Sequence, residues 1–156
     1  MKLVVGLGNP DAKHLKNRHN AGHMLVDFMK ENFAGQGVVF EKSTEFMNNS
    51  GLSVVRLMQK HKVTLGDLYI AHDDLDIPLG EYKIQNNKGP KLHNGIESVE
   101  DKLLTPLFWR IRIGIDSRDA ENRTPGEQYV LSDFSKDELK VLEGVFVSIL
   151  KESAMQ

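Results

Sequence analysis

The 156-residue sequence contains no cysteine, which excludes disulfide bonds, thiolate nucleophiles and cysteine-ligated metal sites. It also lacks an apolar run long enough for a membrane span, and no signal peptide precedes the first apolar segment. The formal net charge is only −2, so the chain lacks the basic excess of a protein that coats nucleic acid. These absences predict a non-membrane protein of the cytoplasm or an organelle matrix, and they leave room for a local basic patch.

The pattern of apolar residues alternates between strand-like and helix-like segments. Short apolar runs predict strands at 2–7, within 34–43, at 68–71, after a turn in 77–84, and at 109–115. Helical spacing begins after Asn20, after Ser50 as a cap, after Asn94, and after a capping box of Ser135 and Glu138. This alternation predicts an α/β sandwich around a mostly parallel sheet.

The segment 109–115 alternates strictly along its length. Its apolar residues share one face, which we expect to lie in the core, and Arg110 and Arg112 share the other. Lys83, Lys88 and Lys91 fall in a stretch without acidic residues, so these cations together are a candidate surface for an RNA backbone. Ordinary solvated side chains are the alternative for each of them.

The first strand runs into a glycine turn, "VVGLGNP", that resembles the start of a nucleotide-binding unit. A dinucleotide fingerprint needs a third glycine and a helix that starts directly after the turn. Here Gly6 and Gly8 are followed by Asn9 and Pro10, and the next helical pattern starts only near Asn20. The turn therefore predicts no nucleotide cofactor.

Polar side chains follow the predicted strands or precede the predicted helices. Because the carboxyl ends of parallel strands meet at one edge of a sheet, we expect these residues to share a crevice there. They are Asn9, His19, Asn48, Asn49, Asp73 and Asn94.

The chemistry of this set favours a proton transfer. His19 is the member that exchanges a proton near neutral pH, and a helix N-terminus beside it should disfavour the imidazolium. Asp73 is suited to orient the ring, and amides suit a carbonyl or an oxyanion. The simplest scheme is a water, activated by His19, that attacks an ester or a similar carbonyl. His72 has no second histidine at ligand spacing, so no metal is predicted.

Each of these residues alone has an ordinary structural explanation as a helix cap, a surface histidine or a loop carboxylate. Their combination is specific. The strings "VVGLGNP", "RHNAG", "FMNNSG", "AHDDLDIPLG", "HNGIES" and "RIRIGI", in this order over roughly residues 1–134, resemble the motifs of bacterial-type peptidyl-tRNA hydrolase.

The resemblance implies a monomeric, single-domain, three-layer α/β/α sandwich around a mostly parallel, mixed sheet. It implies an enzyme that cleaves the ester between a peptide and the 3′ ribose of tRNA without a metal or another cofactor. His19 would be the general base and Asp73 its partner. Substrate-binding residues would be Asn9, Met47, Asn48 and Asn94, and Lys83 and Arg112 would bind the 5′ phosphate of tRNA.

The sequence departs from the family pattern in several places. We expect residues 1–156 to form one domain that is shorter than typical members near 34–46 and at the C-terminus. In the loop "NNKGPKLHNG", Pro90, Lys91 and Leu92 replace residues that allow close backbone approach, which predicts weaker tRNA affinity. An RNA-binding or splicing accessory without turnover, and a hydrolase of small esters, are the alternative functions.

Overall fold

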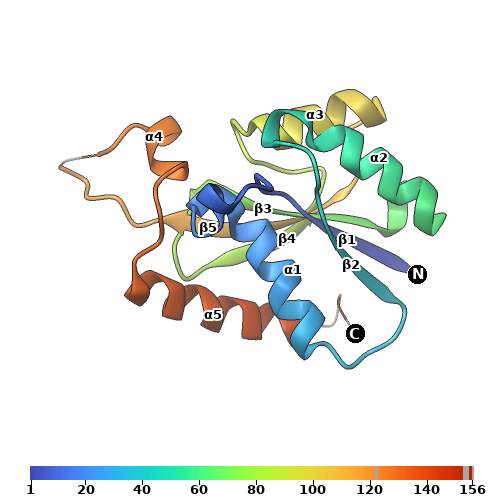
Figure 1. Ribbon diagram of the computed structural model, residues 1–156, viewed down its shortest axis with the longest axis horizontal. Coiled ribbons are helices and arrows are strands. Elements are labelled where there is room, and N and C mark those ends of the chain that lie inside the picture. Colours follow the sequence, from blue (N-terminus) through green and yellow to red (C-terminus); the bar gives the residue numbers. More distant parts are fainter. Residues whose placement is uncertain (122, 153–154, 156) are drawn as a thin grey trace.

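The computed structural model describes residues 1–121, 123–152 and 155, and its centre is a five-stranded sheet (Figure 1). The strand order is β2-β1-β3-β5-β4. Four strands are parallel, and β4 is an antiparallel edge strand that pairs with β5. The strands are β1 (Lys2–Gly6), β2 (Val38–Lys42), β3 (Leu68–Pro78), β4 (Tyr82–Asn86) and β5 (Trp109–Asp116).

Helices cover both faces of this sheet. Figure 1 shows α2 (Ser50–His61) and α3 (Asn94–Leu103) on one face, and α1 (Ala21–Asn32) and α5 (Lys136–Leu150) on the other. A short helix, α4 (Gly126–Val130), precedes α5. Four 3₁₀ turns complete the described part: η1 (Ala12–His14), η2 (Arg18–Asn20), η3 (Met47–Asn49) and η4 (Leu65–Asp67). The predicted α/β/α sandwich around a mixed sheet is confirmed.

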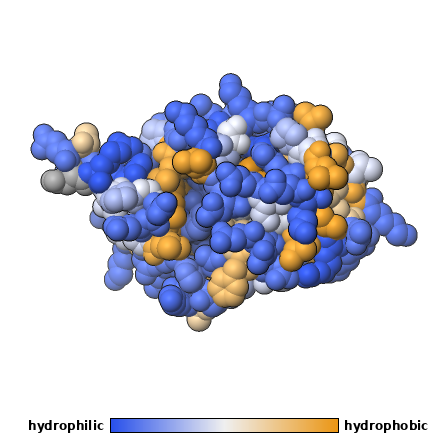
Figure 2. Space-filling view, turned by 90° about the horizontal axis from the view of Figure 1, so that it is seen from above, coloured by the Kyte–Doolittle hydropathy of each residue, from blue (hydrophilic) through white to orange (hydrophobic). Residues whose placement is uncertain are grey.

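Because successive residues of a strand point to opposite faces, β1 supplies two cores at once. Leu3 and Val5 pack with residues of α2 and α3, whereas Val4 packs with residues of α1 and α5. The outer surface over α2 and α3 is mainly hydrophilic, with separate apolar patches (Figure 2). None of the helices in the described ranges combines the length and hydropathy that a membrane crossing needs.

The order of the strands opens a crevice where β1 ends. From β1 the chain crosses to β2 on one side, and β3 lies on the other side, so the direction of winding reverses between β1 and β3. β1 pairs with β3 only as far as Gly6 opposite Ala71, whereas β3 continues to Pro78. β3 therefore continues past the end of β1, and Asp73 lies in this continuation.

A close helix–sheet contact brings the start of α1 to this crevice. A Cβ at Gly22 would lie 2.3 Å from the carbonyl oxygen of Ala71, and a Cβ at Gly6 would lie 2.2 Å from the carbonyl oxygen of Gly22. Only glycine permits this approach of two backbones. The turn η2, which carries His19, thereby lies directly against β3.

Two local expectations are wrong. Ser50 does not cap α2: it is the first helical residue, and its hydroxyl donates to the carbonyl of Met47. The arginine face of β5 is also buried, because α3 and the loop after β4 cover it. Arg110 forms an ion pair with Glu100, and Arg112 forms one with Asp74.

Candidate functional site

His19 and Asp73 meet at the crevice, although they are far apart in the sequence. The Nδ1 atom of His19 lies 2.8 Å from Oδ2 of Asp73. The Asp73 side chain is 2% exposed, whereas the His19 side chain is 12% exposed and reaches the solvent. A carboxylate accepts, so Nδ1 of His19 carries the hydrogen of this bond.

A second histidine, which the sequence reasoning missed, contacts the other carboxylate oxygen. Nε2 of His93 lies 2.8 Å from Oδ1 of Asp73. His93 is also the N-cap of α3, since its Nδ1 accepts a hydrogen bond from the backbone N–H of Ile96. The only sequence signal was its place beside Asn94, directly before the helix.

These contacts fix the tautomers of both rings. Nδ1 of His93 accepts from Ile96, so its Nε2 holds the hydrogen and donates to Asp73. With one oxygen of Asp73 occupied in this way, the other accepts from Nδ1 of His19. Neutral His19 therefore presents an unprotonated Nε2, which has no hydrogen-bond partner among the described residues. That atom can accept a proton.

The electrostatics of the pair also favour proton acceptance. Burial by itself would lower the pKa of His19, but the charge and hydrogen bond of Asp73 outweigh it, and the pKa is raised above 6.5. Burial would likewise raise the pKa of Asp73, but its interactions with His19 and His93 lower it, so the carboxylate stays ionised. The expectation that a helix N-terminus disfavours the imidazolium is therefore wrong, because Asp73 dominates.

The same three residues resemble a metal-binding group by distance alone. Ligand atoms of His19, Asp73 and His93 lie within 4.8 Å of one another. However, a metal on Nε2 of His93 would require the hydrogen to move to Nδ1, where it would face the N–H of Ile96. The hydrogen-bond pattern therefore favours proton transfer over metal binding at these residues.

Asn9 lies at the end of β1 with its amide held in one orientation. Its Oδ1 accepts from the backbone N–H of Met47 at 2.8 Å, and its backbone exchanges two hydrogen bonds with the Asn20 side chain, both of 2.9 Å. The Nδ2 group of Asn9 has no acceptor in the described part of the chain. Asn9 thus offers a fixed donor, and Met47, whose backbone N–H holds its Oδ1, is buried.

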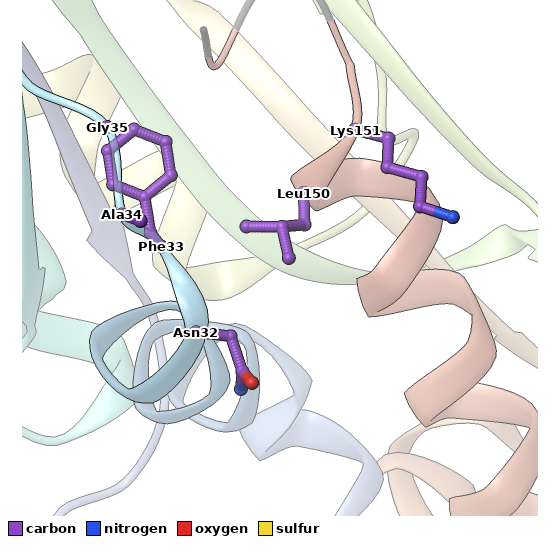
Figure 3. Close-up of a pocket in the computed structure, with 6 residues that line it drawn as sticks. All are labelled: Asn32, Phe33, Ala34, Gly35, Leu150 and Lys151. Atoms are coloured by element: carbon purple, nitrogen blue, oxygen red, sulfur yellow. The ribbon is translucent and has the colours of Figure 1, made fainter.

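Asn48 and Asn94 are exposed and lie on neighbouring elements. Together with Glu97, Ser98 and Asp101 they line a hollow of about 260 Å³. Their amides make no hydrogen bond to any other described residue, so they are available to a ligand. A second hollow of about 430 Å³ lies between the C-terminal ends of α1 and α5 (Figure 3). It is at the amino edge of the strands and contains neither histidine nor aspartate, so it is no part of this site.

The two predicted phosphate-binding residues are neighbours on the sheet. Lys83 of β4 is exposed and stands opposite Arg112 of β5 in the strand register. Arg112 is largely buried: its Nε donates to Asp74 and its Nη1 donates to Gln85. Its Nη2 has no partner among the described residues.

The α/β/α fold, with a solvent-reaching histidine held by a buried carboxylate and free amides nearby, is typical of enzymes that transfer protons. Comparison with known proteins narrows the class. Residues 3–155 match the family model for peptidyl-tRNA hydrolase. The chain belongs to the peptidyl-tRNA hydrolase family.

Similar proteins support this assignment. A peptidyl-tRNA hydrolase of Geotalea uraniireducens is 38% identical over 170 residues, which covers 93% of this chain and 86% of the relative. One of Maridesulfovibrio salexigens is 34% identical over 163 residues, covering 89% of this chain and 78% of the relative.

Solved structures agree at the level of the fold. The crystal structure of peptidyl-tRNA hydrolase from Acinetobacter baumannii superposes with a TM-score of 0.80 at 26% identity, covering 96% of this chain and 85% of that one. A [NiFe] hydrogenase maturation protease from Thermococcus kodakarensis has a TM-score of 0.57 at 14% identity, covering 99% of this chain and 92% of that one, which shows a shared fold alone.

Proposed function

We propose that this protein hydrolyses the ester bond between a peptide and the 3′ ribose of tRNA, releasing both. The observation that carries the proposal is the bare Nε2 of His19, whose tautomer is fixed by Asp73 and His93. Membership of the peptidyl-tRNA hydrolase family supports the choice of substrate.

In this mechanism Nε2 of His19 takes a proton from a water molecule as the water oxygen attacks the ester carbonyl. Asp73 stabilises the imidazolium that forms, through the contact at Nδ1. The carbonyl oxygen becomes an oxyanion, which the Nδ2 group of Asn9 is placed to stabilise. When the tetrahedral intermediate collapses, His19 returns its proton to the departing ribose oxygen, which balances the reaction.

The exposed amides of Asn48 and Asn94 bind the peptide and the terminal nucleotide in this scheme. Both side chains line the hollow of about 260 Å³ beside the crevice. Met47 lines the crevice and fixes Asn9 through its backbone N–H, so it contributes by shape and by orientation.

Lys83 and Arg112 bind the 5′ phosphate of the tRNA. Lys83 supplies an exposed charge, and Nη2 of Arg112 supplies a donor in a side chain held by Asp74 and Gln85. A Lys83→Ala variant tests this role: we expect the same loss of affinity for every tRNA, and a salt slope of log K smaller by about 1. An unchanged salt slope would contradict it.

The test of the activity itself uses an N-blocked aminoacyl-tRNA beside the unblocked form. The wild type should release the blocked amino acid, and His19→Ala should slow this by a factor of roughly 10² to 10⁴. His61→Ala serves as a matched control, because His61 pairs with Glu41 at the far end of α2. Circular dichroism confirms that each variant is folded.

The alternatives predict other results in the same assay. A hydrolase of small esters would turn over nitrophenyl esters and leave both tRNA substrates intact. An RNA-binding accessory would bind tRNA without turnover, and His19→Ala would change nothing. Either pattern would contradict the proposed function.

We also propose that residues 1–156 act as one domain, shortened near 34–46, and as a cytoplasmic monomer. Between α1 and η3 the chain forms one strand, β2, at the edge of the sheet, which supports the shortening near 34–46. Light scattering coupled to gel filtration tests the monomer: a mass near 17.6 kDa is expected, and twice that mass would contradict it.

A further inference from the structure

His19 lies in η2, which is a single 3₁₀ turn of three residues. Such a turn has poor hydrogen-bond geometry and little stability of its own, so contacts from outside must fix the backbone of His19. One contact is on its C-terminal side, where the Asn20 side chain exchanges two hydrogen bonds with the backbone of Asn9. Others are on its N-terminal side, where Asn17 donates to Asp133 and the Arg18 side chain contacts residues that follow β5.

The Arg18 side chain is buried among residues that follow β5. Its Nη1 donates to the hydroxyl of Ser132 at 2.5 Å and to the carbonyl of Asp133 at 2.9 Å. Its Nη2 donates to Oε1 of Glu138 at 2.7 Å. Its guanidinium also lies over the Tyr129 ring, 4.2 Å from the centroid.

The backbone continues this connection. The N–H of Arg18 donates to the carbonyl of Ser132, and the N–H of Phe134 donates to the carbonyl of Lys16. Glu138 is itself fixed, because it completes the capping box of α5 and accepts from Ser117. The segment before His19 is therefore attached to a rigid helix start in the layer formed by α1 and α5.

We propose that Arg18 is a positioning residue for His19, and that its contacts with Ser132, Asp133 and Glu138 set the place of the His19 ring relative to Asp73. Arg18 acts through the backbone of η2 and does not touch the reacting atoms. The guanidinium is needed for its shape: its fork reaches three acceptors at fixed angles, which the single ammonium of lysine does not. The consequence for catalysis rests on the proposed function.

The test replaces Arg18 by lysine, which keeps the charge. We expect kcat on N-blocked aminoacyl-tRNA to fall roughly 10- to 100-fold with KM changed less than about threefold, because misplacement of a reacting group costs rate more than binding. Arg56→Lys is the matched control, since Arg56 of α2 forms a pair with Glu45 at the protein surface.

A second readout does not depend on activity. The imidazole of His19 is titrated by NMR in each variant, and in Arg18→Lys its pKa should fall back toward 6.5 as the contact with Asp73 loosens. Arg56→Lys should titrate as the wild type does. A folded Arg18→Lys protein with unchanged kcat, or with an unchanged His19 titration, would overturn the proposal.

Two further cases are decided by the same measurements. If Arg18→Lys does not fold, Ser132→Ala removes one acceptor and leaves the charge pair; a wild-type titration in that variant overturns the proposal, and a lowered pKa supports it. If the wild type does not cleave peptidyl-tRNA, the proposed function fails, and the NMR titration still decides the role of Arg18.

Discussion

At the scale of single residues, the two oxygens of the Asp73 carboxylate accept hydrogen bonds from two histidines that have different roles. His93 donates to Oδ1 and holds the carboxylate in place, because its own ring is fixed by the start of α3. His19 donates to Oδ2 and keeps its outer nitrogen free. A third ring, His72, is fully buried, and burial together with His93 lowers its pKa to about 3, so it stays neutral beside them.

This arrangement predicts the pH dependence of the reaction. The raised pKa of His19 means that the imidazolium persists above pH 6.5, and the base form appears only as the pH rises further. We expect kcat/KM to increase with pH through an apparent pKa above 6.5, since this parameter reports the free enzyme. A pH–rate profile measured from pH 5 to pH 9 checks this. An acid limb centred below 6.5 would contradict it.

Asp73→Asn separates the orienting role from the fold. The amide has one acceptor oxygen and one NH₂ donor group. When the oxygen accepts from His93, the NH₂ group faces Nδ1 of His19. Nδ1 must then accept, so the hydrogen of His19 moves to Nε2, which is the wrong tautomer for a base. We expect kcat to fall by up to about 10⁴-fold with the protein still folded. The matched control is Asp27→Asn, at an exposed pair with Lys42. A wild-type rate in Asp73→Asn would exclude the orienting role of Asp73.

At the scale of elements, the site depends on how closely α1 approaches the sheet. A Cβ at Gly22 would lie 2.3 Å from the backbone of Ala71 and 2.7 Å from that of Leu7. Because both contacts are with backbone atoms, neither α1 nor the sheet can move away without loss of stability. We expect Gly22→Ala to lower the free energy of unfolding by roughly 1–3 kcal/mol or more, and to lower kcat because η2 moves with α1. Urea denaturation and the tRNA assay measure the two effects.

Gly144 of α5 supplies the opposite case. A Cβ there would meet nothing within 4 Å. Alanine in a helix interior is more favourable than glycine, so Gly144→Ala should raise the free energy of unfolding by roughly 0.5–1 kcal/mol at unchanged kcat. If both glycine variants lost stability equally, the close approach at Gly22 would not be the cause.

The elements themselves were largely predictable from local patterns. Strict alternation at 109–115 and the capping box at Ser135 both gave correct elements, because each depends on neighbouring residues alone. The continuation of β3 to Pro78 was missed. The polar residues of this continuation are typical of a loop. They form a strand because they pair with β5, which is distant in the sequence.

The site was predictable in part for the same reason. His19 and Asp73 were found because each stands beside a local apolar pattern: His19 precedes the helical pattern of α1, and Asp73 follows the apolar run at 68–71. His93 was missed because its contact with Asp73 depends on where α3 packs. The burial of Arg110 and Arg112 in β5 was missed because their partners lie in other elements. Glu100, the partner of Arg110, is in α3, and Asp74, the partner of Arg112, is in β3.

At the scale of the whole molecule, buried histidines link stability to pH. Burial, and then the charge of Lys42, lowers the pKa of His23 to about 4, and the pKa of His72 is about 3. Below pH 6.5 the unfolded chain binds protons at these positions while the folded protein does not. Stability therefore falls as the pH falls. His19 acts in the other direction: its contribution is complete below 6.5 and is lost as the pH rises through its raised pKa.

Between pH 6.5 and about 5.5 the contribution of His19 is nearly complete, so His23 and His72 dominate the slope. Nearer pH 4.5 the carboxyl groups with lowered pKa values add to it; they are Glu41, Asp73, Asp116 and Glu138. As the pH falls, each of these two histidines should lower the free energy of unfolding, with a slope that approaches about 1.4 kcal/mol per pH unit.

The His23→Gln variant isolates the contribution of one of these histidines. The hydroxyl of Ser43 donates to Gly8, so the ring nitrogen of His23 donates to that hydroxyl, and glutamine keeps such a donor without titrating. Urea denaturation at pH 6.5, 5.5 and 4.5 should show a shallower slope in the variant, whatever its stability at pH 6.5. Equal slopes would mean that His23 is protonated in the folded protein, and that its burial against Ser43 does not resist acid.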